Sequence, residues 1–200
     1  TLRLSSAASD VYKRQTKKLL LMIFQRFMKI IKYLIQFVII CIFYIIFRII
    51  GVKLSSSLSG KLFEIIGPIF RSKEIINNNL KKAFPDYSSK EFNKIKSSMW
   101  NNYGRVFAEY LYMKNFRNGN LSKNISIEGE DILLNIKDQN QKVVFISGHF
   151  SNFELMAMQI DKIGIKIGAI YRPLNNIFLN KFMERIRKKY ICNNQIKKGI

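Results

Sequence analysis

Apolar residues follow one another almost without interruption in the first quarter of the chain. From Tyr33 to Phe47 the one clearly polar side chain is Gln36, and lysines and arginines stand on both sides of the run. Fifteen helical residues reach about 22 Å, less than the roughly 30 Å hydrocarbon core of a bilayer. The run predicts a membrane-anchor helix over residues 22–53, either a transmembrane helix held by snorkelling cations or a helix in the membrane plane. An uncleaved signal-like segment is a third interpretation.

The first residues differ in composition from the rest of the chain. Thr1–Gln15 contains Ser, Ala and Asp, whereas the residues that follow are rich in Lys, Ile and Asn. We predict that residues 1–21 are a non-native or disordered leader, with a natural start at Met22 or Met28.

Helical periodicity dominates the segment from Leu54 to Phe116. Apolar residues three and four apart form successive faces, and Gly67-Pro68 interrupts the first of them. Ser88 and Glu91 have the spacing of a capping box, which opens another helix. These residues predict a set of packed helices after the anchor.

The pattern changes at Val143–Ile146, a short apolar run that ends in Ser147-Gly148. A run of this length predicts a buried strand. Helical periodicity follows as far as Gly164, and Ile165–Tyr171 predicts a second strand. Strand, helix and strand in this order predict a right-handed βαβ unit, and therefore an α/β fold.

The only histidine, His149, stands where the first predicted strand passes into the helix. In α/β sheets, binding sites lie outside the carboxyl ends of the strands. If the helix begins near Ser151, Glu154 lies in its first turn, and its carboxylate can orient the imidazole as a general base for an alcohol. Ser151 and Glu154 also have the spacing of a capping box, which would give Glu154 a purely structural role.

Basic residues greatly outnumber acidic ones: 34 Lys and Arg against 13 Asp and Glu give a formal charge of +21. This charge favours anionic partners, namely phospholipid headgroups, phosphorylated glycolipids, an acidic carrier protein or nucleic acid. The apolar anchor and the absence of a base-reading motif argue against nucleic acid. A predicted helix over Ile177–Tyr190 is strongly basic and forms either a solvated face or an anion site.

Two cysteines, Cys41 and Cys192, lack the spacing of metal ligands, and a single histidine is present to assist them. The sequence therefore predicts neither a disulfide framework nor a zinc site. We expect no metal, and a reducing, cytoplasmic environment for the soluble part.

Several short motifs occur in a characteristic order between Lys61 and Ile200. They are Asn79-Leu80 with Ala83-Phe84-Pro85, Met99–Arg105 with Glu109, Gly148–Glu154, and Tyr171–Asn176. Together they resemble the lauroyl/myristoyl acyltransferases of bacterial lipid A biosynthesis, within the lysophospholipid acyltransferase-like superfamily and its H-x-x-x-x-acid motif. The central motif of that family usually reads H-F-G-N-W-E, whereas here Ser151 replaces the glycine and Phe153 the tryptophan. After Asn176, Ile177 replaces a common proline.

The resemblance implies a glycerol-3-phosphate acyltransferase-like fold. An N-terminal membrane-anchor helix and a helical segment would precede a mixed sheet that contains the βαβ unit, with helices packed on it. Members of the family continue beyond this length, so we expect a C-terminally truncated chain in which residues 54–200 form the N-terminal part of the acyltransferase domain.

The resemblance also assigns roles to individual residues. His149 would be the general base and Glu154 its orienting partner. Arg172, Asn175, Asn152 and Arg187 are the expected substrate-binding residues.

The implied activity is transfer of a fatty acyl chain from an acyl carrier protein thioester to a hydroxyl of a lipid A precursor. The expected place is the cytoplasmic side of the bacterial inner membrane, with acyl carrier protein, the phosphorylated lipid A precursor and anionic membrane lipids as partners. The acyl-acyl carrier protein is the donor, and no cofactor is implied. The alternatives are another glycolipid or glycerolipid acceptor, or a non-enzymatic membrane-bound module.

Overall fold

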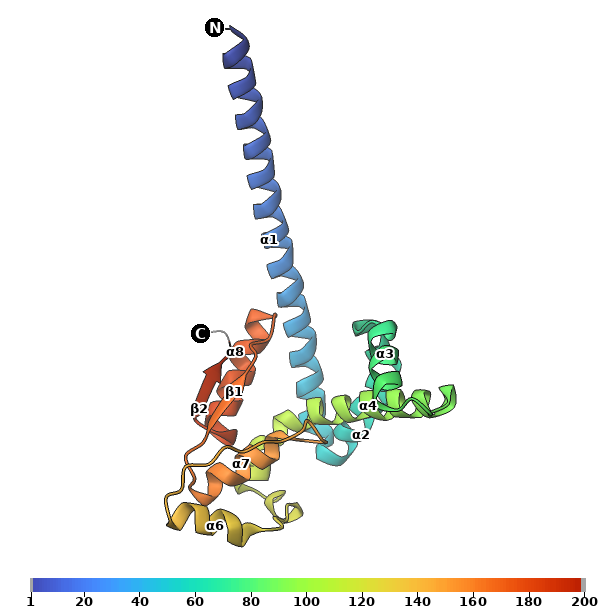
Figure 1. Ribbon diagram of the computed structural model, residues 1–200, viewed down its shortest axis with the longest axis vertical. Coiled ribbons are helices and arrows are strands. Elements are labelled where there is room, and N and C mark those ends of the chain that lie inside the picture. The colour runs from blue at the N-terminus through green and yellow to red at the C-terminus, as the bar shows by residue number, and fades with distance from the viewer. Residues whose placement is uncertain (1, 199–200) are drawn as a thin grey trace.

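One long helix determines the shape of the computed structural model, which describes residues 2–198 (Figure 1). Helix α1 (Leu2–Ile50) projects far beyond the other elements, which gather around its C-terminal end. Its stretch Val11–Ile50 is long and apolar enough to cross a membrane. The apolar helix predicted near the N-terminus is thus present. The boundary between a leader and an anchor at residues 21 and 22 stays a prediction.

Three helices follow α1 and account for the predicted helical segment. They are α2 (Val52–Phe70), α3 (Lys73–Ala83) and α4 (Ser89–Glu109). The predicted capping box is confirmed, because Ser88 accepts from the Glu91 amide and the Glu91 carboxylate accepts from the Ser88 amide at 2.7 Å. Helix α2 continues through Pro68 and ends at Phe70, so the proline lies near the end of the helix rather than breaking it.

Small residues allow α2 and α4 to lie in close contact. A Cβ atom at Gly104 would lie 2.2 Å from the carbonyl oxygen of Ser59, so only glycine fits this position. The Ser59 hydroxyl donates to the Gly104 carbonyl at 2.6 Å, and both residues are buried. At Gly67 a Cβ would lie 2.3 Å from the Trp100 ring. The glycine of the Met99–Arg105 motif is therefore explained by helix packing.

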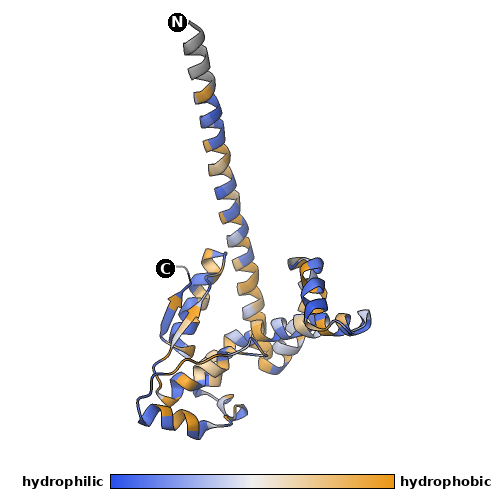
Figure 2. Ribbon diagram, in the orientation of Figure 1, coloured by the Kyte–Doolittle hydropathy of each residue, from blue (hydrophilic) through white to orange (hydrophobic). Residues whose placement is uncertain are grey.

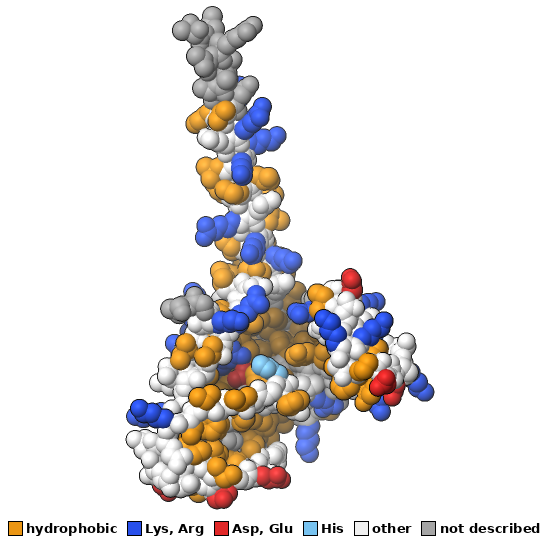
Figure 3. Space-filling model, in the orientation of Figure 1, with side chains coloured by type: hydrophobic (Ala, Val, Ile, Leu, Met, Phe, Trp, Pro, Cys, Tyr) orange, Lys and Arg blue, Asp and Glu red, His pale blue; other side chains and the backbone are white. Residues whose placement is uncertain are grey.

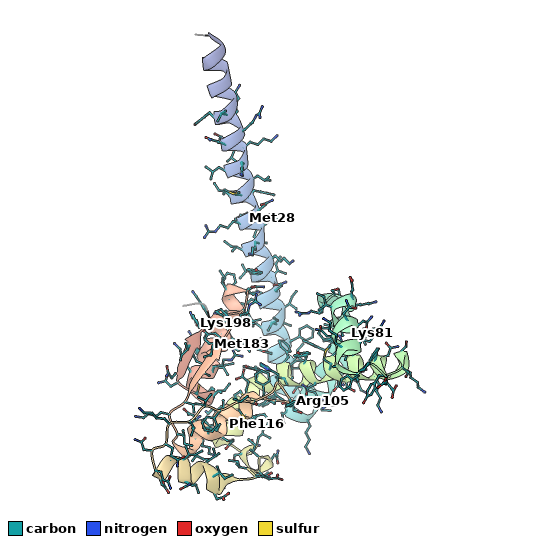
Figure 4. All side chains as sticks on the ribbon, in the orientation of Figure 1. Met28, Lys81, Arg105, Phe116, Met183 and Lys198 are labelled. Carbon is teal, nitrogen blue, oxygen red and sulfur yellow. The ribbon has the colours of Figure 1, made fainter. Side chains whose placement is uncertain are left out.

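The remaining elements are short and form the C-terminal part of the fold. In chain order they are η1 (Tyr110–Tyr112), α5 (Met113–Asn118), η2 (Ser122–Asn124), α6 (Glu130–Asp138), α7 (Glu154–Ile163), β1 (Gly168–Tyr171), α8 (Ile177–Ile186), the π-helical turn η3 (Arg187–Ile191) and β2 (Asn194–Lys197). Met113, Met158 and Ile191 are fully buried in their shared core, against which Phe116 and Met183 pack (Figure 4). Each such side chain contributes about 1.5–3 kcal/mol through burial, so this core joins α5, α7 and η3.

The sheet has two parallel strands, with Gly168 of β1 opposite Asn194 of β2 and Tyr171 opposite Lys197. Helix α8 and η3 connect the strands, so the protein contains a βαβ unit and is broadly an α/β protein. The prediction of a strand over Ile165–Tyr171 is confirmed for its second half. The predicted partner of that strand is wrong, and the described residues form no mixed sheet.

Val143–Ile146, predicted as the first buried strand, forms no strand in the structure. Val144 and Ile146 are 88% and 93% exposed, and no residue within 2–198 pairs with them as a strand. An apolar run becomes a strand only where another segment satisfies its backbone groups. The observed partner, β2, has a short and polar sequence that gives no strand signal.

Candidate active site

The best-connected polar group in the C-terminal part of the structure surrounds Glu154, the first residue of α7. Its side chain is buried, and its Oε1 atom accepts hydrogen bonds from the hydroxyl of Tyr110 and from the guanidinium of Arg187. The Arg187 Nη2–Oε1 distance is 2.5 Å and the Nε–Oε1 distance is 2.9 Å. A buried carboxylate is tolerated when a cation and hydrogen bonds compensate for lost water, as they do here.

Three separate elements supply this group, because the core described above brings them together. Tyr110 begins η1, directly after α4, and Arg187 begins η3, directly after α8. Burial raises the pKa of Tyr110 above its usual range, and the Glu154 carboxylate adds to the rise. The hydroxyl therefore stays protonated at neutral pH and serves as a hydrogen-bond donor.

Two aromatic rings hold the Arg187 guanidinium in place. Its central carbon lies 6.0 Å from the ring centre of Tyr110 and 5.6 Å from that of Tyr171, both within cation–π range. Tyr171 in turn donates to Glu184, and burial together with this bond raises the pKa of Tyr171 to about 12. The tyrosine of the Tyr171–Asn176 motif thus supports the arginine that pairs with Glu154.

The expected bond between His149 and Glu154 is not formed in this structure. His149 lies on the exposed segment before α7, and its imidazole packs 4.3 Å from the ring of Phe153 at an interplanar angle of 58°. In Figure 3 the histidine side chain, in pale blue, lies at the surface among hydrophobic side chains. All hydrogen bonds to Glu154 from residues 2–198 end on Oε1, so Oε2 is free to accept an imidazole N–H.

The alternative role for Glu154, a capping box with Ser151, is wrong. Helix α7 begins at Glu154 itself, and its N-cap residue is Phe153, which forms no side-chain capping bond. Ser151 instead adopts a positive φ of 44°, in the left-handed region that favours glycine. This geometry explains why the related motif H-F-G-N-W-E has glycine at the position of Ser151.

Asn152 contacts α4 rather than open solvent. Its Nδ2 atom donates to Oε2 of Glu109 at 2.8 Å, and the other carboxylate oxygen of Glu109 accepts from Ser56 at 2.9 Å. The Oδ1 atom of Asn152 is buried without a hydrogen-bond partner in the described part of the chain. The side-chain amide of Asn152 therefore helps to hold the residues just before α7 against α2 and α4.

Arg172 and Asn175 lie on the exposed segment between β1 and α8, and neither side chain forms a hydrogen bond with residues 2–198. The neighbouring Asn176, which the sequence analysis did not select, is buried and caps α8 through bonds to the amides of Phe178 and Leu179 at 3.1 Å. Its Nδ2 atom also donates to the carbonyl of Tyr33 at 2.9 Å.

The structure therefore brings Glu154 and Arg187 together, places Asn152 nearby on Glu109, and leaves His149, Arg172 and Asn175 exposed. It adds Tyr110 to the group. Tyr110 carries no local signal in the sequence, because its role depends on two partners 44 and 77 residues away.

A largely apolar hollow of about 590 Å³ lies beside this group, and Tyr110 forms part of its wall. Tyr44 and Ile45 of α1 and Phe182 and Ile186 of α8 line it, together with Arg48 and Lys114. Within residues 2–198 no cluster of His, Cys, Asp and Glu is suited to hold a metal ion.

Comparison with known proteins identifies the class of protein to which this site belongs. A family model described as bacterial lipid A biosynthesis acyltransferase matches residues 21–193, which include every residue of the site. The chain belongs to this family of acyltransferases. No curated protein and no solved structure matched the chain.

Proposed function

We propose that the protein transfers a fatty acyl chain from an acyl carrier protein thioester to a hydroxyl of a lipid A precursor, at the cytoplasmic side of the bacterial inner membrane. The observation that carries the proposal is the His149-x-x-x-x-Glu154 motif, whose glutamate is buried and charge-paired at the start of α7. A carboxylate fixed in this way is suited to orienting a second group rather than to meeting solvent.

His149 acts as the general base in this scheme. Its unprotonated nitrogen takes the proton of the acceptor hydroxyl while the hydroxyl oxygen attacks the thioester carbonyl carbon. The new C–O bond forms, the C–S bond breaks, and the imidazolium returns its proton to the departing thiolate. The products are the acylated lipid and the free thiol of the carrier, with no covalent enzyme intermediate.

Glu154 orients the base through its free Oε2 atom. Arg187 and Tyr110 both bond to Oε1 and restrain the carboxylate, and Oε2 forms no hydrogen bond within residues 2–198. Hydrogen bonds of catalytic groups are often absent without substrate and form in the complex. Substrate binding is expected to move the exposed His149 segment onto Oε2.

The surroundings of the site fit both substrates. The apolar hollow beside Tyr110 suits the acyl chain, where each buried methylene contributes about 0.8 kcal/mol. A separate hollow of about 520 Å³ on α8 and η3 is lined by four cations, Lys181, Arg185, Lys188 and Lys189, and by one carboxylate, Glu184. These cations suit an acidic carrier protein, and the exposed Arg172 suits a phosphate of the acceptor.

The test is acyl transfer by the chain in membranes, with a panel of acyl carrier protein thioesters and a lipid A precursor. His149→Ala and Glu154→Gln should each lower kcat by about 10²–10⁴ with little change in KM. Ser147→Ala, an exposed change on the same segment, is the matched control. Full transfer by a folded His149→Ala variant would refute the mechanism. If a glycerolipid and the lipid A precursor compete and the glycerolipid is acylated preferentially, the acceptor is a glycerolipid.

A further inference from the structure

Two consecutive residues at the end of α4 hold the residues that precede and begin α7. Glu109 is the last residue of α4, and Tyr110 is the first residue of η1. The Oε2 atom of Glu109 accepts from the Nδ2 atom of Asn152 at 2.8 Å, and the Tyr110 hydroxyl donates to Glu154. One short stretch of chain therefore fixes the second half of the His149–Glu154 motif at two alternate positions.

The end of α4 is itself firmly held by the helices around it. Ala108 is buried and packs with Tyr44 and Phe47 of α1, and Figure 2 shows the C-terminal end of α1 as mainly hydrophobic. The Oε1 atom of Glu109 accepts from the hydroxyl of Ser56 on α2 at 2.9 Å, and Ser56 is buried as well. The Glu109 carboxylate thus has little freedom to move.

Glu109 interacts with the described part of the chain through hydrogen bonds and not through an ion pair. Its side chain is half-buried, and it forms no salt bridge with residues 2–198. A carboxylate that loses water without gaining a cation depends on its hydrogen bonds to remain in place. The bonds to Ser56 and Asn152 are therefore what this side chain contributes.

The bond to Glu109 also decides which way the side-chain amide of Asn152 faces. A carboxylate only accepts hydrogen bonds, so the amide must present its Nδ2 atom to Glu109. Its Oδ1 atom is then buried without a hydrogen-bond partner in residues 2–198, which is an unfavourable arrangement. Without an acceptor at Glu109 the amide would be free to rotate and to pair its oxygen elsewhere.

The His149 end of the motif lacks this support. His149, Phe150 and Ser151 are exposed, and Ser151 has a positive φ of 44°, which few residues other than glycine adopt. The chain turns at Ser151, so the placement of Asn152 directly after the turn influences the direction in which His149 points. A misplacement of about 1 Å in a catalytic group can lower a rate by about 10²-fold.

We propose that Glu109 is a positioning residue for acyl transfer. By fixing the amide of Asn152, it sets the geometry of the turn at Ser151. This turn directs His149 toward the Oε2 atom of Glu154. The inference rests on the proposed function and adds to it a residue that touches neither the base nor its glutamate partner.

Steady-state acyl transfer by the chain in membranes tests this role. Glu109→Met keeps the length of the side chain but removes both acceptors, so it should lower kcat by about 10–100-fold and change KM by less than about threefold. Glu109→Gln should keep most of the activity, because its amide can accept from Asn152 and donate to the Ser56 hydroxyl. Glu64→Met is the matched control, because Glu64 is also half-buried and accepts from Asn101 in the same α2–α4 contact. A kcat of Glu109→Met equal to that of the control would overturn the proposal.

A double variant tests whether Glu109 acts through Asn152. Glu109→Met combined with Asn152→Leu should be about as slow as the slower of the two single variants, because both changes break the same link. Losses that multiply would show that the two residues act separately, which would also overturn the proposal. Ser56→Ala is a milder change that removes one of the two bonds to Glu109. It should lower kcat by about two- to tenfold, and an unchanged kcat would contradict the role of Glu109 even if Glu109→Met failed to fold.

The position of His149 can also be followed without any enzymatic activity. His149 is the only histidine, so isotope-labelled histidine gives a single imidazole NMR signal in detergent when the purification tag contains no histidine. Glu109→Met should shift or broaden this signal, whereas Glu109→Gln and Glu64→Met should leave it as in the wild type. An unchanged signal in Glu109→Met would overturn the proposal. A wild-type protein that transfers no acyl chain would refute the proposed function instead, and the NMR signal would still show whether Glu109 positions His149.

Discussion

The ion pair between Arg187 and Glu154 is largely enclosed, so removing one of its two partners should measurably lower the stability of the protein. The two side chains are 18% and 8% exposed and lie 2.5 Å apart. In Arg187→Met the carboxylate loses its cation while staying enclosed, which typically costs 3–5 kcal/mol, so we expect a loss of about 3 kcal/mol in the free energy of unfolding. Domains are stable by about 5–15 kcal/mol, so the variant should still fold.

Denaturant unfolding in detergent, followed by circular dichroism, measures this loss. Arg187→Met, Glu154→Gln and the double variant form a cycle in which the double variant should be less destabilised than the sum of the single variants by about 1–3 kcal/mol. Arg185→Met is the matched control, because Arg185 is exposed and pairs with no acidic residue in 2–198; its change should stay within about 0.5 kcal/mol. Additive single variants, or an Arg187→Met variant as stable as the control, would refute the reasoning.

Three further substitutions test the packing around the site. Gly104→Ala should destabilise the α2–α4 contact by about 1–3 kcal/mol, because its Cβ would overlap the Ser59 carbonyl oxygen; an unchanged thermal midpoint would contradict the contact. Ser151→Gly should stabilise the protein by up to about 1 kcal/mol in urea unfolding, because it relieves a positive φ, and a loss of stability would show that this geometry is wrong. Asn176→Ala should cost about 1–2 kcal/mol through the lost cap of α8. The exposed Asn175→Ala should cost less than about 0.5 kcal/mol in the same experiment, and equal losses would remove the assigned role of Asn176.

The sequence alone was sufficient to predict several local structural features of the chain. Periodicity and turn residues predicted the long apolar helix, the capping box at Ser88 and the helix that ends at Gly164, because these features depend on residues close together in the chain. The spacing of His149 and Glu154 likewise marked the start of α7 as the place for chemistry. Their catalytic roles, and those of Arg172, Asn175, Asn152 and Arg187, stay predictions.

Tertiary structure alone decided which segments meet. The same apolar pattern that predicts a strand at Val143–Ile146 finds no partner within residues 2–198, whereas the polar segment Asn194–Lys197 pairs with β1. Glu154 bonds to Tyr110 and Arg187, and not to the imidazole or the helix amides that the sequence analysis considered. A buried carboxylate must have its charge compensated, and the Arg187 guanidinium provides this compensation. Hydrophobic and helical patterns depend on neighbouring residues, so they can be predicted from the sequence. Strand pairing and charge compensation join residues that are distant in the chain, so they are determined only when the core packs.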